Sequence, residues 1–247
     1  MFPLRDDNPT ELPPIITVGI ILATCGVWVL IQGAGFSGPA MEASVCTWGA
    51  IPAEIMGGGD WRQGPCRPGG VGVAALFTSM FLHGGWGHLI GNMWFLWIFG
   101  NNVEDSMGHL RFLVFYLLCG LAAAAAHMWS EPSSVLPMVG ASGAISAIMG
   151  AYLLLYPRAR VKTFFFFIIF FTVVELPAFL YLGYWFLLQV LGVFGPTASG
   201  GVAFWAHIGG FVAGLVLIFV FRNPRLVQAK RSHVVLPRDQ VRFGGWF

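Results

Sequence analysis

Charged residues are scarce in this chain of 247 residues, where they make up 10% of the sequence while hydrophobic residues make up 57%. Soluble globular domains carry roughly 25% charged residues. The deficit excludes an ordinary soluble domain and predicts a protein that crosses a membrane several times. The net charge of +2 is close to neutral and gives no indication of a nucleic-acid partner.

The motifs of two common hydrolase classes are missing. The zinc-binding motif H-E-x-x-H does not occur, and His83 and His88 are five residues apart rather than on one ridge of a helix. The G-x-S-x-G turn of soluble hydrolases would need a glycine two places after Ser142, where Ala144 stands instead. The sequence therefore favours neither a zinc protease nor a soluble serine hydrolase.

Aspartates are missing from the apolar segments, which argues against a third class. An intramembrane aspartyl protease needs two aspartates within its spans. The five aspartates of this chain lie in expected tails or loops or at the end of a span: Asp6, Asp7, Asp60, Asp105 and Asp239.

Long apolar runs predict six membrane spans. They extend approximately from Ile15 to Gln32, His88 to Val103, Phe112 to Trp129, Ser142 to Tyr156, Phe164 to Leu182 and Gly201 to Phe221. A bilayer core of roughly 30 Å needs about 20 helical residues, so we expect the second and fourth spans to be short. We expect the first run to be retained as a span, because Met1–Pro14 is acidic and lacks the small-residue cleavage site of a signal peptide.

The apolar run from Phe164 to Phe194 is longer than one span and is interrupted by Glu175 and Pro177. We interpret its first part as the fifth helix and the remainder as an interfacial loop that ends at Gly195-Pro196. Trp185 is expected near the interface. The sequence thus predicts an all-α membrane protein with six spans over residues 15–221, a long outer loop at residues 33–87, an N-terminal tail of residues 1–14 and a basic C-terminal tail of residues 222–247.

The basic residues predict the orientation of these spans. With the N-terminus in the cytoplasm, all but two of the 13 Lys and Arg residues lie on the cytoplasmic side, and the exceptions are Arg62 and Arg67 in the outer loop. The positive-inside rule favours this topology, with both termini cytoplasmic. It places Ser142 at the outer end of the fourth span and His207 about six residues into the sixth, roughly 9 Å deep.

Ser142 begins the fourth span in a glycine-bracketed segment, Gly140 to Gly150. Ser142, Ser146 and Gly150 are spaced four residues apart and form a stripe of small residues on one helical face. Such stripes commonly let a neighbouring helix pack closely without any chemistry. Because a polar group in lipid needs a partner or a task, a catalytic hydroxyl is the alternative interpretation.

The sixth span has a similar face that carries a titratable group. Ala203, His207, Gly210 and Gly214 lie within one narrow face of a helix. Two helices that meet through faces of small residues approach closely enough for a serine hydroxyl and an imidazole to form a hydrogen bond. A nucleophile and its base require such a bond. A buried structural histidine is the alternative, but an ionisable residue inside a span favours a functional role.

His88 and Asn92 offer two side-chain donors on one face at the outer end of the second span. Such donors suit an oxyanion that develops on a carbonyl oxygen during acyl transfer. Hydrogen bonding between helices is the alternative interpretation of this pair.

These motifs together resemble those of the rhomboid intramembrane serine proteases. The resemblance extends over roughly residues 77–219. It depends on the following residues: Phe77 to His83, His88, Asn92, Gly100, Glu104, Gly108, Arg111, Phe112, Tyr116, Gly140 to Gly143, Ala206 to Gly210 and Gly214.

The resemblance implies a six-helix rhomboid-like bundle that cleaves transmembrane substrates in the lipid bilayer without a metal or cofactor. It implies that Ser142 is the nucleophile, that His207 is the general base, and that the Ser142 backbone N–H, His88 and Asn92 form the oxyanion hole. Structural roles are expected for the following residues: His83, Glu104, Arg111, Gly210 and Gly214. The fifth span and its loop are the expected lateral gate for substrates.

The sequence departs from the family pattern in two places. Trp61-Arg62 lies some twenty residues upstream of where the family often has a Trp-Arg pair, and Ser146 stands where some members have an aromatic residue that packs on the base. The group that steadies the His207 ring is therefore not predicted. We expect Glu104 to hold the loop before the third span, with Arg111 as a candidate partner.

Two alternative functions belong to other classes. A silent rhomboid-like protein would bind transmembrane helices without cutting them, but such proteins characteristically lack the Ser142 and His207 pair that this chain retains. A small permease would show inverted repeats and polar residues at mid-bilayer, and only Glu175 fits that pattern. The expected location is a bacterial cytoplasmic membrane.

The four cysteines divide by topology. Cys25 and Cys119 fall in expected spans, whereas Cys46 and Cys66 both lie in the outer loop. An even pair on the non-cytoplasmic side is the arrangement in which disulfides persist, so we predict a Cys46–Cys66 bridge, with two free thiols as the alternative.

Overall fold

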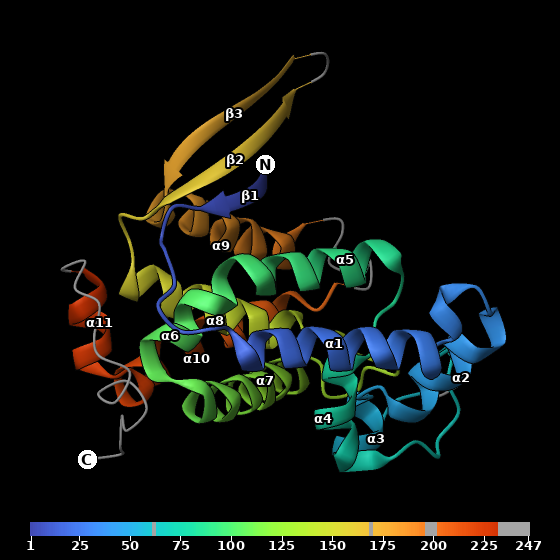
Figure 1. Cartoon of the computed structure of the whole chain (residues 1–247). Coiled ribbons are helices and arrows are strands. Elements are labelled where there is room, and N and C mark those ends of the chain that lie inside the picture. The colour runs from blue at the N-terminus through green and yellow to red at the C-terminus, as the bar shows by residue number, and fades with distance from the viewer. Residues whose placement is uncertain (61–62, 168–169, 196–201, 232–247) are drawn as a thin grey trace.

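The computed structural model describes residues 1–60, 63–167, 170–195 and 202–231. Within these ranges the chain is mainly helical, and the long helices lie side by side (Figure 1). The long helices are α1 (Ile15–Leu30), α7 (His109–Ser130), α8 (Ser142–Leu155), α9 (Ala178–Phe194) and α10 (Phe204–Phe221), together with α5 (Trp86–Phe95), which continues into α6 (Asn101–Met107). The remaining helices are α2 (Gly38–Trp48), α3 (Pro52–Met56), α4 (Ala75–Thr78) and α11 (Pro224–Arg231).

Two helices of the described ranges, α7 and α10, are long and apolar enough to cross a membrane. The helices α1, α8 and α9 are apolar but shorter. The predicted first, third, fourth and sixth spans therefore correspond to helices α1, α7, α8 and α10, although Gly201 lies outside the described residues. The short length of α8 agrees with the expectation for the fourth span.

The second span is not short, contrary to our expectation. Helix α5 continues through a π-helical turn, Leu96–Gly100, directly into α6, so the helical run extends from Trp86 to Met107. A π-helical turn accommodates an extra residue without ending the helix, which the apolar pattern alone does not reveal. This run carries Asn92 near one end and Glu104 near the other.

The predicted fifth helix from Phe164 to Leu182 is wrong in its first part. Residues Arg160–Phe167 and Phe170–Pro177 form strands β2 and β3 of an antiparallel hairpin, which projects from the helices (Figure 1). Helix α9 begins only at Ala178, directly after Pro177. Aromatic and β-branched residues favour strands, and a short apolar run cannot be assigned to strand or helix from periodicity.

The base of the hairpin is held by ion pairs and by a third strand. Glu175 lies across from Lys162 in the register and accepts from both Arg160 and Lys162 at 3.3 and 3.2 Å. Strand β1 (Phe2–Asp6) pairs antiparallel with β2, so part of the expected N-terminal tail belongs to a sheet with the order β1-β2-β3. Glu175, the candidate mid-bilayer residue, is thus an exposed partner of two cations.

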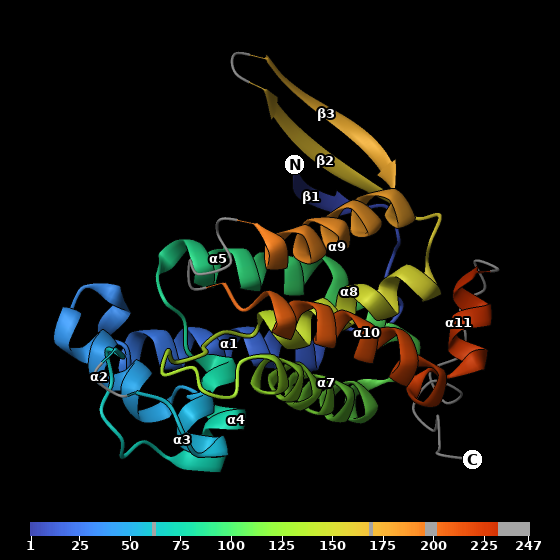
Figure 2. The ribbon, with the colours of Figure 1, turned by 180° about the vertical axis from the view of Figure 1, so that it is seen from behind.

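Helices α8 and α10 pack backbone to backbone, as the small residues predict (Figure 2). A methyl group added at Gly210 would overlap the carbonyl oxygen of Gly143, and one added at Gly214 would overlap that of Ala147. The contacting face of α8 therefore passes through Gly143, Ala147 and Gly150, so the predicted stripe of Ser142, Ser146 and Gly150 contributes Gly150 to this backbone contact. Only glycine permits such a close approach.

The segment between α1 and α5 is built from short helices and a disulfide. Cys46 and Cys66 are bonded, with their Cα atoms 5.3 Å apart, and Cys66 packs with Ile51 and Val135 in a small separate core. Cys25 and Cys119 are free thiols. The predicted pairing is therefore present in the structure, where it ties this segment together.

Glu104 is buried at the junction of α1, α6 and α7. Its carboxylate accepts hydrogen bonds from the backbone N–H groups of Ile16 and Thr17, from the Thr17 hydroxyl, and from His109 Nδ1 at 2.6 Å. A carboxylate at the start of α1 satisfies N–H groups that have no partner within the helix. Arg111, the candidate partner expected from the sequence, lies near the start of α7.

Asp105 is buried beside Glu104 and binds both predicted tails. It accepts from the backbone N–H groups of Glu11 and Leu12 at 3.0 and 2.8 Å, and from Lys230 Nζ on α11 at 2.7 Å. Lys230 also donates to Asn102. The two ends of the described chain are thus held at one end of the helical bundle.

Candidate active site

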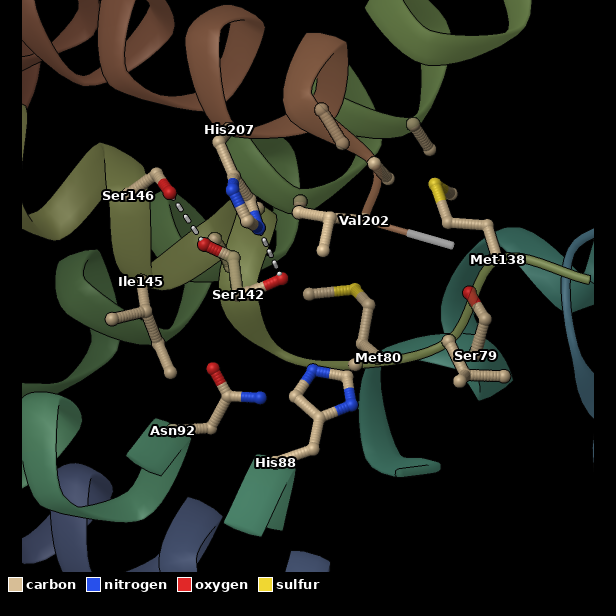
Figure 3. Close-up of a pocket in the computed structure, with 18 of the residues that line it drawn as sticks. Ser79, Met80, His88, Asn92, Met138, Ser142, Ile145, Ser146, Val202 and His207 are labelled. Atoms are coloured by element: carbon tan, nitrogen blue, oxygen red, sulfur yellow. Dashed lines mark hydrogen bonds between the residues drawn. The ribbon is translucent and has the colours of Figure 1, made fainter. Parts of the chain in front are cut away.

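Ser142 and His207 form a hydrogen bond in the structure, with 2.9 Å between Ser142 Oγ and His207 Nε2. Ser142 is the first residue of α8, and His207 lies in the first turns of α10 (Figure 3). Both side chains are half-buried and line the same cavity. The close contact of the two helices brings together residues that are 65 positions apart, in the geometry that a nucleophile and its base require.

The chain before Ser142 is held by Gly140, whose φ of +121° is rarely adopted by residues with a side chain. The Gly140 N–H donates to the Ser79 carbonyl at 2.8 Å. A methyl group at Gly140 would come within 2.8 Å of the His88 ring. Glycine at this position therefore lets the loop before Ser142 lie against His88.

Ser146 does not pack on the His207 ring. Its hydroxyl donates to the Ser142 carbonyl at 2.7 Å, one helical turn back (Figure 3). Two residues of α9 contact the imidazole instead. The Trp185 ring lies 5.9 Å from the His207 ring, and Gln189 Oε1 lies 2.8 Å from His207 Nδ1.

Gln189 was not predicted from the sequence, and Trp185 was expected near the interface. Both differences arise because the expected fifth helix ends at Leu182, whereas α9 extends from Ala178 to Phe194 and brings both residues against His207. A signal was available in the sequence. Gln189 is the one amide side chain between Ala178 and Phe194, and a polar side chain inside an apolar helix usually has a partner.

His88 and Asn92 lie together on α5, on the other side of Ser142 from His207 (Figure 3). The Gly84 N–H donates to His88 Nδ1 at 3.3 Å, so the proton of a neutral His88 ring is on Nε2, the nitrogen that faces Gly140. Within the described residues, the buried Nδ2 of Asn92 has no hydrogen-bond partner. Two N–H donors are therefore available beside Ser142.

The cavity around these residues has a volume of about 440 Å³. Ser142, His207, His88 and Asn92 all line it, together with glycine and apolar side chains. Such a mixture, mostly apolar with a few convergent polar groups, is typical of a ligand pocket. In the part of the chain that the structure describes, no cluster of three or more His, Cys, Asp or Glu residues could hold a metal ion.

The remaining predicted residues lie around the site. His83 is fully buried, and its backbone is paired on both sides with the Gln32 side chain at 2.9 Å. Burial, with a smaller contribution from His88, lowers the pKa of His83 to about 3, so its ring is neutral at physiological pH. Gly210 and Gly214 hold α10 against α8, whereas Trp61-Arg62 lies outside the described residues.

The comparisons with known proteins all point to the same family. Residues 72–224 match the profile described as "Rhomboid domain". Over 204 residues, or 83% of this chain and 62% of the relative, it is 26% identical to "Rhomboid protease GlpG" of Pectobacterium atrosepticum. Over 173 residues, or 68% of this chain and 48% of the relative, it is 31% identical to "RHOMBOID-like protein 6, mitochondrial" of Arabidopsis thaliana.

A third relative is "Rhomboid-like protease 5" of Toxoplasma gondii, 33% identical over 170 residues, which are 65% of this chain and 17% of that protein. This chain thus spans between about half and three fifths of the length of the first two relatives, and much less of the third. The residues matched by the profile include Ser142 and His207.

Proposed function

We propose that this chain, which belongs to the rhomboid family and is an integral membrane protein, is a serine endopeptidase that hydrolyses peptide bonds in or near the transmembrane segments of other membrane proteins. The observation that supports the proposal most is the hydrogen bond of 2.9 Å between Ser142 Oγ and His207 Nε2, at the wall of a cavity with two further N–H donors. Names of relatives that include "protease" point the same way.

Acylation would begin at Ser142. His207 Nε2 accepts the hydroxyl proton while Ser142 Oγ attacks the carbonyl carbon of the scissile peptide bond. The carbonyl oxygen becomes an oxyanion, and the imidazolium of His207 then gives its proton to the leaving amine as the C–N bond breaks. Water attacks the acyl-enzyme in the second half, with His207 again as the base, and restores Ser142.

The oxyanion would be stabilised by the Ser142 backbone N–H, His88 Nε2–H and Asn92 Nδ2–H. Because these donors have no partner in the resting state, no hydrogen bond has to break before they bind the charge that develops on the substrate. No step requires a metal or a cofactor, since the proton transfers and the charge are accounted for by residues of this chain.

The six apolar segments, with α9 (Ala178–Phe194) as the corrected fifth, are proposed to be the six spans of a rhomboid-like bundle. The basic residues favour cytoplasmic termini, and we propose a bacterial cytoplasmic membrane as the location. Relatives named as mitochondrial show that the family also occurs elsewhere. Helix α9 and its loop are the proposed lateral gate, and substrates with helix-breaking residues are expected to be cleaved best.

The test is cleavage of a model membrane protein with a single transmembrane segment by the purified full chain in detergent or liposomes. Wild type is expected to cut it, and Ser142→Ala is expected to cut at background rate while still folded. Ser130→Ala is a matched control, because the hydroxyl of this serine on α7 donates to the Ala126 carbonyl and does not line the cavity. Binding of the segment without cleavage by wild type would instead favour a silent, helix-binding rhomboid.

A further inference from the structure

Gln189 is the polar group of α9 that reaches His207. Its amide oxygen lies 2.8 Å from His207 Nδ1, and its amide nitrogen lies 3.3 Å from the backbone oxygen of Trp185. An amide side chain is costly in an apolar helix unless its donors and acceptors are used. Here both ends of the Gln189 amide have a partner, so the side chain is held in one orientation against the imidazole.

The bond to Trp185 decides which way the amide points. A backbone carbonyl only accepts hydrogen bonds, so the group facing the Trp185 oxygen must be the NH₂ of Gln189, and the oxygen must face His207. An acceptor at this place requires a proton on His207 Nδ1. The neutral ring then has an unprotonated Nε2, which faces Ser142 Oγ.

This arrangement selects the useful tautomer of His207. If the proton were on Nε2 instead, that nitrogen could not take the proton of Ser142, and Nδ1 would face the lone pairs of the Gln189 oxygen. After proton transfer the ring carries a positive charge, and the Gln189 oxygen accepts a hydrogen bond from the cationic N–H. Hydrogen bonds of this type are about twice as strong as neutral ones.

We propose that Gln189 is the positioning residue of His207, so that Gln189, His207 and Ser142 form a chain of three hydrogen-bonded side chains. The inference rests on the proposed function, because it assigns a role in the same proton transfer. Within the described residues, the Gln189 oxygen is the only group hydrogen-bonded to His207 Nδ1. Gln189 does not touch the reacting atoms and acts only through the imidazole.

The location of Gln189 adds a consequence for substrate entry. Ser142 is on α8 and His207 is on α10, whereas Gln189 is on α9, which is held against α10 by the stacked rings of Phe186 and Phe211 at 4.5 Å. The orientation of the base therefore depends on α9 being in contact with α10. Displacement of α9 would remove the acceptor from Nδ1.

The experiment compares three variants of the full chain on the transmembrane substrate. Gln189→Met keeps the size and removes the acceptor, Gln189→Glu keeps the acceptor, and Leu118→Ala is a control on α7 at a side chain that is 43% exposed and does not line the cavity. We expect kcat to fall by roughly 10- to 100-fold in Gln189→Met with KM unchanged. This is less than the roughly 10⁴-fold effect of losing the charged orienting group of a serine-protease triad. Gln189→Glu is expected to recover most of the loss, and Leu118→Ala to behave as wild type.

A second measurement is independent of turnover. In protein with ¹⁵N-labelled histidine, the ring signals of His207, identified by their loss in His207→Gln, report which nitrogen carries the proton. Wild type is expected to be protonated on Nδ1, and Gln189→Met to show an increased fraction protonated on Nε2.

The two proposals fail in distinguishable ways. Cleavage by wild type with unchanged kcat in Gln189→Met would overturn the role of Gln189 alone, as would equal losses in Gln189→Met and Gln189→Glu. Wild-type ring signals protonated on Nε2 would also overturn it. Cleavage that persists in Ser142→Ala would overturn the proposed function and, with it, the role of Gln189.

Discussion

The helical run from Trp86 to Met107 passes through two polar regions that differ in how their hydrogen bonds are used. At one end, the Glu104 and Asp105 carboxylates are surrounded by donors from α1, α7 and α11. At the other end, Asn92 is buried with its Nδ2 unpaired within the described residues and directed at a cavity. A satisfied polar group stabilises a fold, whereas an unsatisfied donor in a cavity is available to a ligand.

Glu104→Ala tests the end of this helical run where the carboxylates are fully hydrogen-bonded. It has the largest expected effect on stability. Four donors would lose a buried carboxylate, and breaking a buried charged contact from one side costs about 3–5 kcal/mol. The midpoint of thermal unfolding in detergent should fall strongly, while kcat of the fraction that remains folded should match wild type. Loss of kcat without loss of stability would place Glu104 in the chemistry and break the comparison.

Asn92→Ala tests the other end of the run, where the donor has no partner. It should lower kcat and leave the stability almost unchanged. Loss of one oxyanion-hole donor typically lowers kcat by about 10²–10³-fold, because the donor is used only when charge develops. KM and the unfolding midpoint should change little, since the Nδ2 group makes no hydrogen bond in the described structure. Wild-type turnover together with a lower unfolding midpoint would reassign Asn92 to packing.

Asp6 lies at the hydrogen-bonded end of the run and should have a smaller effect on folding stability, one that depends on pH. Its carboxylate accepts from Tyr152 and Asn102, but burial outweighs these bonds and raises its pKa from 3.8 to about 6. The folded protein therefore binds this proton more tightly than the unfolded chain does. The stability that this proton contributes is present below about pH 4 and is lost as the pH rises through about 6.

The measurement for Asp6 is the unfolding midpoint of wild type and Asp6→Asn across this pH window. The wild-type midpoint should decrease relative to that of Asp6→Asn as the pH rises, because asparagine has no proton to lose. Parallel curves for the two proteins would show that the Asp6 carboxyl does not titrate in this way.

Much of the site could be predicted from the sequence, because it depends on local spacing. Small residues at helical intervals predicted that α8 and α10 pack closely, and this contact brings Ser142 to His207. His88 and Asn92 follow from a spacing of four on one helix. The Cys46–Cys66 bridge followed from topology and is present in the structure.

The wrong predictions came from sequence patterns that do not distinguish a strand from a helix or reveal contacts between distant residues. The run from Phe164 to Pro177 is apolar apart from Thr172 and Glu175, and its described residues belong to strands β2 and β3, whose register pairs Lys162 with Glu175, a contact that periodicity does not encode. The contact of Glu104 with Thr17 joins residues 87 positions apart, which no local signal reveals. Gln189 was missed because its role depends on where α9 lies.

The central claim is that His207 activates Ser142, and labelling by a fluorophosphonate probe tests it most directly. In this reaction Ser142 Oγ bonds to phosphorus, fluoride leaves, and His207 takes the proton. Mass spectrometry of the detergent-solubilised wild type should find the adduct on Ser142, and His207→Ala should label at background rate although it remains folded. Equal labelling of Ser142 in wild type and His207→Ala, or an adduct only on another residue, would contradict the account.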